Sequence, residues 1–433
     1  MNDRLRTLLA SALLLAAAAA PVQATDGHFL HGVGAVNSAM GGAGVASPSS
    51  LLGTYYLNPA GLMAFDGTRM EFGFELFRAD RTLSSDLPGF ASGSTRSKRD
   101  WVPIPAMGIS TRLQNDKVVV GVGALGIGGF GVDYAASTSN PILTPQPNGF
   151  GQIYSNYQFL KISPAVAFAP VPRVWIGASL NVDWASLAVN PMPVAAPDVD
   201  VGTGTAYYPT ATASDGAFGY GFQAGILVKP NDLIALGASY SSPQYFESFE
   251  FNSTVANPNL PTYGTPRTIK FRLDVPAVYG FGVALSPLPT LTIAADGRYI
   301  TYGSTRGFDK KGFRSDGSVR GFGWKNIWVV AVGGEFRPTD RLALRAGYNR
   351  SQNPISKAQS FFNTPAPAIM ESHLSFGGGV QVSRRIEVSA AYYHVAKASL
   401  TGPIPNPAVP PGSTVTNAMS EDALLFQVTL KSR

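Results

Sequence analysis

Short turns and long polar stretches alternate along most of this chain of 433 residues. Nearly all of the six short turns contain Pro, Asn or Asp, which favour tight turns through a fixed φ or local side-chain hydrogen bonds. They lie at Leu113–Lys117, Pro170–Arg173, Lys229–Asp232, Ser286–Thr290, Arg337–Arg341 and Ser383–Arg385. Seven longer stretches flank them, at about residues 82–99, 133–155, 188–216, 249–267, 304–322, 353–371 and 399–419. These thirteen connections predict an all-β fold of fourteen antiparallel strands.

Apolar and polar residues alternate within the clearest predicted strands. Met70, Phe72, Phe74 and Leu76 share one face of the first strand, and residues 69, 71, 73 and 75 share the other. This period of two fits a soluble sandwich with its apolar face inward, and it equally fits a membrane barrel with that face toward lipid. The alternation of long and short connections and the even strand count favour a closed transmembrane barrel.

The first residues resemble a secretory signal. Residues 1–24 carry Arg4 and Arg6, then an apolar stretch from Leu8 to Ala20, then small residues up to Ala24, which predicts cleavage after Ala24. Beyond them no apolar run reaches the 18 or so residues that a spanning helix needs. The formal net charge is +6 and 14% of residues are charged, which argues against a nucleic-acid partner. We expect a protein of the outer membrane of a Gram-negative bacterium.

Residues 25–67 precede the first predicted strand and need another place in the fold. The stretch from Ala39 to Phe65 carries no charge and has neither a strand nor a helix period. It contains too many large apolar residues for a disordered tail. We therefore predict that residues 25–67 form a plug, or hatch, inside a barrel of residues 68–433, which excludes an open porin.

Four segments, two near each end of the mature chain, resemble one known family. "TDGHFLHGVGAVNSAMGGAGVA" at the start of the mature chain, "LNPAGL" at residues 57–62, and "LALRAGYNRSQNPI" with "FNTPAPAIMESHLSFGGG" at residues 342–379 are similar to the FadL-type (OmpP1, TodX) outer-membrane transporters of long-chain fatty acids and hydrophobic compounds. The resemblance implies a fourteen-stranded barrel with an amino-terminal hatch. It also implies ligand capture among extracellular loops, a pocket near the start of the hatch, and sideways exit at a kinked third strand.

The third predicted strand, Val118–Val132, contains an unusual number of glycines. Six glycines remove side chains from this part of the wall, so a kink or lateral opening is physically reasonable. The alternative is that the glycines let the plug pack closely against the wall. The candidate opening is formed by Gly121, Gly123, Gly126, Gly128, Gly129 and Gly131.

Ligand-binding residues are predicted from the resemblance and from charge. Fatty-acid members of the family are expected to hold a carboxylate with inward basic side chains, including one from the fifth strand. The fifth strand here, residues 174–187, has no Lys or Arg. Other arginines can substitute, although lumenal arginines also form structural charge ladders. The predicted pocket residues are Phe29, Leu30, Arg272, Arg298 and Arg345.

The tripeptide Asn58, Pro59 and Ala60 is predicted to lock the hatch against the wall, since asparagine can satisfy two backbone partners and proline fixes the turn. The alternative is an ordinary loop turn.

Other kinds of site are rejected. Gly126–Gly131 matches a dinucleotide-binding pattern, but no helix or ribose-binding acid follows it. The four histidines are too scattered for a zinc site. We therefore expect a monomeric transporter, not an enzyme, with no cofactor or metal, whose partners are a hydrophobic small molecule and membrane lipid. Long-chain fatty acids are favoured over neutral aromatic or alkane compounds, and a structural or adhesive barrel is the remaining alternative.

Overall fold

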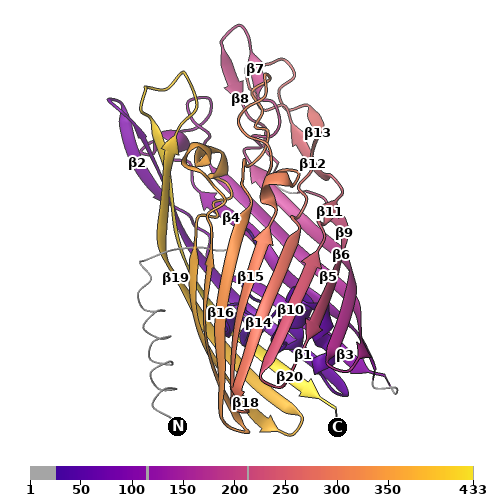
Figure 1. Cartoon of the computed structure of the whole chain (residues 1–433). Coiled ribbons are helices and arrows are strands. Elements are labelled where there is room, and N and C mark those ends of the chain that lie inside the picture. Colours follow the sequence, from indigo (N-terminus) through magenta and orange to yellow (C-terminus); the bar gives the residue numbers. More distant parts are fainter. Residues whose placement is uncertain (1–25, 114–116, 212–213, 433) are drawn as a thin grey trace.

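Fourteen antiparallel strands form a closed barrel in the part of the chain that the computed structural model describes, residues 26–113, 117–211 and 214–432 (Figure 1). The predicted signal peptide lies outside these residues. The barrel closes where Arg69 of the first strand pairs with Lys431 of the last. The wall strands are β1 (Thr68–Leu87), β3 (Val102–Arg112), β4 (Val118–Tyr134), β5 (Ile153–Val171), β6 (Val174–Asn190), β9 (Ala217–Val228), β10 (Ile234–Ser241), β14 (Val278–Leu288), β15 (Leu291–Ile300), β16 (Ile327–Thr339), β17 (Leu342–Ser351), β18 (Ser372–Ser383), β19 (Ile386–Pro403) and β20 (Thr414–Lys431).

All six predicted turns lie between consecutive wall strands, although residues 114–116 of the first turn are outside the described part. The predicted loop at 82–99 is wrong over much of its length, because β1 continues to Leu87 and pairs with β20 up to Asp86 and Thr414. Several long connections carry strands and short helices of their own. These are β2 (Ala91–Arg96), η2 (Pro141–Leu143), β7 (Asp198–Asp200), β8 (Thr205–Tyr207), β11 (Tyr245–Phe246), β12 (Phe249–Thr254), β13 (Pro266–Phe271), η3 (Tyr302–Ser304), η4 (Lys357–Gln359) and η5 (Phe361–Asn363).

The barrel is apolar on its outer face and polar on its inner face. Phe72 and Phe74 of β1 are 44% and 43% exposed, whereas Glu71 and Glu75 on the same strand are 0% and 4% exposed. This arrangement would be unstable in water and is the pattern of a transmembrane barrel. The outward position of the apolar face therefore favours a membrane barrel over a soluble sandwich, the two interpretations that the period of two allowed. Among the described residues, no helix is long and apolar enough to cross a membrane.

The residues before β1 form three short helices, α2 (Gly34–Ala39), α3 (Leu51–Leu57) and η1 (Pro59–Ala64), drawn in indigo in Figure 1. Helix α2 contacts β1 and β17–β20, α3 contacts β1, β3 and β4, and η1 contacts β4, β5, β6 and β9. Ser50 caps α3 by accepting a hydrogen bond from Gly53 N at 3.1 Å. The apolar residues Leu51, Leu52 and Leu62 of this segment are fully buried. The many apolar residues of this segment are therefore packed inside the barrel, as expected for an ordered segment and not for a disordered tail.

Polar groups of the inner wall bind the backbone of this segment. Asp296 Oδ2 of β15 accepts hydrogen bonds from Gly44 N at 2.6 Å and Val45 N at 2.9 Å. On the opposite side Glu71 Oε2 accepts one from Leu52 N at 3.2 Å. Such charge-assisted bonds to buried backbone N–H groups are among the stronger ones in proteins.

Asn58 connects the same segment to itself and to the wall. Its Nδ2 donates to Val45 O at 2.8 Å and to Ile226 O of β9 at 3.2 Å, while its Oδ1 accepts from Ala60 N at 3.1 Å. Pro59 and Ala60 begin η1 and lie against Gly177 of β6, where a Cβ would come within 2.4 Å of Ala60 N. The Asn58 side chain therefore has three backbone partners, one of which belongs to the wall.

Candidate functional site

The barrel wall is interrupted between β3 and β4. Their pairing begins at Arg112 and Val119, next to the short turn that joins the two strands. It stops at Ala106 and Leu125, although β4 continues to Tyr134 toward the long connections, which is the direction called upward here. Above Ala106, β3 pairs only with β1 and contains Pro103 and Pro105. Proline has no N–H for a ladder hydrogen bond, which accounts for the loss of pairing.

Residues 28–30 occupy the edge of β4 at this gap. Leu30 N donates to Ile127 O at 3.0 Å, Gly129 N donates to His28 O at 3.0 Å, and Phe29 bridges to Gly128. The β4–β5 register shifts between Gly126 and Gly128, which marks a bulge. A Cβ on Gly128 would lie 2.5 Å from His28 O, so the close approach of the two backbones requires glycine.

The start of this segment is held by Arg298 of β15 and by Tyr302 of η3, which follows β15. The Tyr302 hydroxyl accepts a hydrogen bond from His28 N and donates one to Asp26 O, both at 3.0 Å. Arg298 Nη2 lies 2.8 Å from Asp26 Oδ2. Burial lowers the pKa of His28 to about 3, so its ring is neutral near pH 7.

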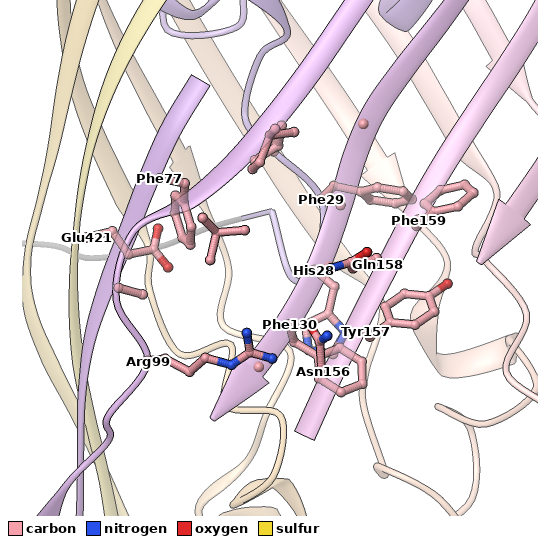
Figure 2. Close-up of a pocket in the computed structure, with 18 of the residues that line it drawn as sticks. His28, Phe29, Phe77, Arg99, Phe130, Asn156, Tyr157, Gln158, Phe159 and Glu421 are labelled. Carbon is pink, nitrogen blue, oxygen red and sulfur yellow. The ribbon is translucent and has the colours of Figure 1, made fainter. Parts of the chain in front are cut away.

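A cavity of about 430 Å³ lies between residues 27–30, the gap and β5 (Figure 2). This volume is within the range of roughly 300–1,000 Å³ of small-molecule sites. Phe29, Phe77, Phe130 and Phe159 give it apolar walls. The outward-facing pair Leu160 and Trp184 also lines it, as do inward-facing residues of β5. The lining of the cavity therefore includes residues from both the inner and the outer face of the wall.

Three charged groups line this cavity from the inside. Arg81 and Glu421 are 8% and 2% exposed. Among the described residues, Arg81 Nε, Arg99 Nε and Glu421 Oε2 have no hydrogen-bond partner. In Figure 2 the side chains of Arg99 and Glu421 point toward the space between Phe77 and Phe130. Two guanidinium groups and one carboxylate thus line the same apolar space, and Arg99 Nη2 also donates a hydrogen bond to Ser155 O at 3.2 Å.

A second, smaller cavity of about 40 Å³ lies on the other side of Phe29, which lines both cavities. Its polar lining includes Lys161 of β5, Gln223 and Arg298. Lys161 Nζ donates to Gln223 Oε1 at 3.0 Å. Phe29 therefore separates the large cavity from a small one that has a lysine and an arginine in its lining.

Four charged residues of the two cavities were not predicted from the sequence: Arg81, Arg99, Glu421 and Lys161. Arg81 lies an even number of residues from Glu71 on the same strand, so both side chains point inward. The direction of Arg81 could therefore have been predicted from the sequence. Arg99 lies in the connection between β2 and β3, where no alternation of apolar and polar residues predicts the direction of a side chain.

The structure brings only some of the predicted pocket residues together. Phe29 and Leu30 line the large cavity, and Arg298 lines the small one. Arg272 and Arg345 line neither of these two cavities. Arg272 Nε pairs with Asp274 at 3.0 Å. Arg345 is buried between Glu335 at 2.6 Å and Glu387 at 3.8 Å, which is a structural charge ladder.

The six glycines of β4 divide into two groups. Gly126, Gly128, Gly129 and Gly131 line the large cavity. Gly121 and Gly123 pair with β3 below the gap, so they do not lie at the opening. A Cβ on these two would come within 2.3 Å and 2.7 Å of Tyr55, so here the alternative of close packing holds. Of the six glycines, only Gly126, Gly128, Gly129 and Gly131 therefore lie beside the unpaired part of β3 and β4.

Known proteins resemble this chain in sequence family and in fold. A protein-family model described as outer membrane protein transport protein (OMPP1/FadL/TodX) matches residues 15–433. The toluene transporter TodX of Pseudomonas putida is 18% identical, with a TM-score of 0.71, over 93% of this chain and 99% of that chain. A FadL homologue of Pseudomonas aeruginosa is 16% identical, with a TM-score of 0.70, over 94% and 99%. The toluene transporter TbuX of Ralstonia pickettii is 17% identical, with a TM-score of 0.64, over 92% and 98%.

No curated protein sequence matches the chain. At identities below 20% the solved structures establish the shared fold alone. The family model, in contrast, spans nearly the whole sequence. The chain therefore belongs to the OMPP1/FadL/TodX family of outer-membrane transport proteins.

Proposed function

We propose that this protein takes up hydrophobic molecules that carry a carboxylate, with long-chain fatty acids as the best candidates. The observation that carries the proposal is the apolar cavity that Arg81 and Arg99 line from the inside together with one carboxylate, Glu421. A buried anion needs a partner, and a guanidinium can offer two parallel N–H groups to a carboxylate. The phenylalanines would hold the alkyl chain.

The path that we propose has three parts. Residues 25–67 act as a plug that closes the lumen. The buried contacts of their three helices with strands on opposite sides of the barrel support this. Ligand captured among the extracellular loops enters the large cavity beside residues 28–30. It then leaves sideways between β3 and β4, where the pairing stops and the cavity is lined by outward-facing residues. An apolar chain that passes directly into lipid avoids a cost of about 25 cal/mol per Å² in water.

Removing the cationic groups tests the ligand class. Arg81→Ala and Arg99→Ala are each expected to weaken binding of a long-chain fatty acid by about tenfold, since a hydrogen bond to a charged group contributes about 1.5–3 kcal/mol. Binding of the methyl ester of the same acid should be unchanged. The measurement is a titration of purified protein with both ligands. The control is Arg345→Lys, which keeps the charge of a residue outside the cavity.

A neutral ligand is the second candidate, because the similar structures include transporters described as toluene transporters. Equal binding of acid and ester, and indifference of both to the arginines, would favour it. If the purified protein binds neither the acid, the ester nor toluene, a structural or adhesive barrel is the better explanation.

Asn58→Ala is expected to loosen the plug and to lower fatty-acid uptake several-fold without lowering the amount of folded barrel. The substitution leaves Val45 O, Ile226 O and Ala60 N without their partner, at a cost of about 1–3 kcal/mol for each buried group. Uptake by cells is compared with the amount of folded protein on unheated gels. Unchanged uptake would mean that Asn58 makes an ordinary turn.

A further inference from the structure

The cavity opens on the outside just below the upper edge of the apolar belt. On β1 the outward residues are apolar up to Leu76, and the next outward residue is Arg78. Leu76 pairs with Pro103 of β3 at the gap. On β20 the outward residue after Leu424 is Asp422, which pairs with Arg78. A row of polar side chains therefore begins one step above the opening.

Arg78 stands at the rim of this opening on the outer face. Its side chain is 40% exposed, and its Nε is 3.9 Å from Asp100 Oδ1, which is a long and exposed contact. Its guanidinium carbon lies 5.8 Å from the centre of the Trp101 ring. Asp100 itself lines the cavity, and the preceding residue, Arg99, lines it from the inside. Near the gap, the guanidinium of Arg99 therefore lies on the inner side of the wall and that of Arg78 on the outer side.

The acid opposite Arg78 is already held by other donors. Asp422 Oδ1 accepts a hydrogen bond from the Tyr392 hydroxyl at 2.6 Å and lies 2.9 Å from His394 Nδ1. A second carboxylate at Arg78 would therefore leave Asp422 hydrogen-bonded.

From this arrangement we propose that Arg78 binds the carboxylate of the departing ligand on the outer face of the barrel. The inference rests on the proposed function and adds a second binding site to it. A carboxylate that entered the hydrocarbon layer would lose its hydrogen-bond partners at a large cost. Transfer from Arg99 inside to Arg78 outside keeps the charged group in the polar row, while the alkyl chain slides through the gap below it. A neutral ligand needs no such site.

Arg78→Ala tests the proposal. It is expected to slow uptake of a long-chain fatty acid by about fivefold, near the upper end of what one exposed charge pair contributes. Uptake of the methyl ester should stay unchanged, and so should the affinity of the purified protein for the acid, because Arg78 does not line the cavity. Arg78→Lys should restore most of the rate.

Arg96→Ala is the matched control, because Arg96 is also an outward-facing arginine and pairs with Asp80 further from the opening. It should leave uptake of both ligands unchanged. If Arg78→Ala leaves acid uptake unchanged, or slows acid and ester equally, the outer site is refuted while the proposed function stands. If the wild-type protein neither binds nor takes up the acid, the proposed function fails, and the outer site fails with it.

Discussion

Gly126→Phe should reduce uptake of fatty acid and of its methyl ester by at least about tenfold, and by more than it weakens binding to the purified protein, because Gly126 lines only the outward side of the cavity. Gly126 pairs with Leu160 and faces outward at the gap, where a Cβ would already lie 2.7 Å from Ile104 Cγ2. A phenyl ring there extends across the opening toward β3. The ring fills the path that an alkyl chain of similar width needs, and close-packed interiors tolerate little overlap.

Gly297→Phe is the matched control for this substitution. Gly297 lies on β15, away from the gap, and a Cβ there meets no atom within 4 Å. The added ring should therefore face lipid without changing uptake. Rates are measured in cells that produce equal amounts of folded protein. Normal uptake through the Gly126→Phe variant would show that ligand leaves by another route, such as past the plug.

Asp296→Ala should release the plug and produce ion conductance in planar bilayers, where we expect the unmodified protein to conduct little. The substitution leaves Gly44 N and Val45 N without an acceptor in a buried place. Each unpaired buried group costs about 1–3 kcal/mol, so the plug loses about 2–6 kcal/mol of its attachment. A fourteen-stranded barrel without its plug leaves a wide aqueous lumen.

Asp296→Asn and Asp232→Ala complete this experiment. Asparagine keeps an acceptor oxygen at the same place, so the variant should conduct less than Asp296→Ala. Asp232 is 98% exposed in the turn between β9 and β10, and its removal should have no effect. A bilayer trace of Asp296→Ala that matches the wild type would mean that this carboxylate does not hold the plug, and a steady large current from the wild type would contradict the plug itself.

The sequence by itself determined the architecture and the family. Turn residues act locally, and a two-residue period is a property of a single strand, so fourteen strands could be counted and their two faces separated without the structure. The outer-membrane location was expected from the signal-like start and the strand pattern, and a non-enzymatic role from the rejected motifs. The family followed from the resemblance at residues 25–62 and 342–379, and the family model supports all three. The fatty-acid specificity and the sideways exit stay predictions.

Where the pairing of the wall stops and which charged residues share a cavity were decided only by the tertiary structure, which also places the apolar face of the strands outward. The alternation is the same for an inward and an outward apolar face, and only closure of the barrel places Glu71 inside. The six glycines of β4 look alike in sequence, yet pairing with β3 separates Gly121 from Gly126. Arg81, Arg99 and Glu421 come from distant parts of the chain and meet because β1 and β20 close the barrel beside the gap. Contacts of this kind depend on register and closure, which are properties of the whole sheet and not of any one segment.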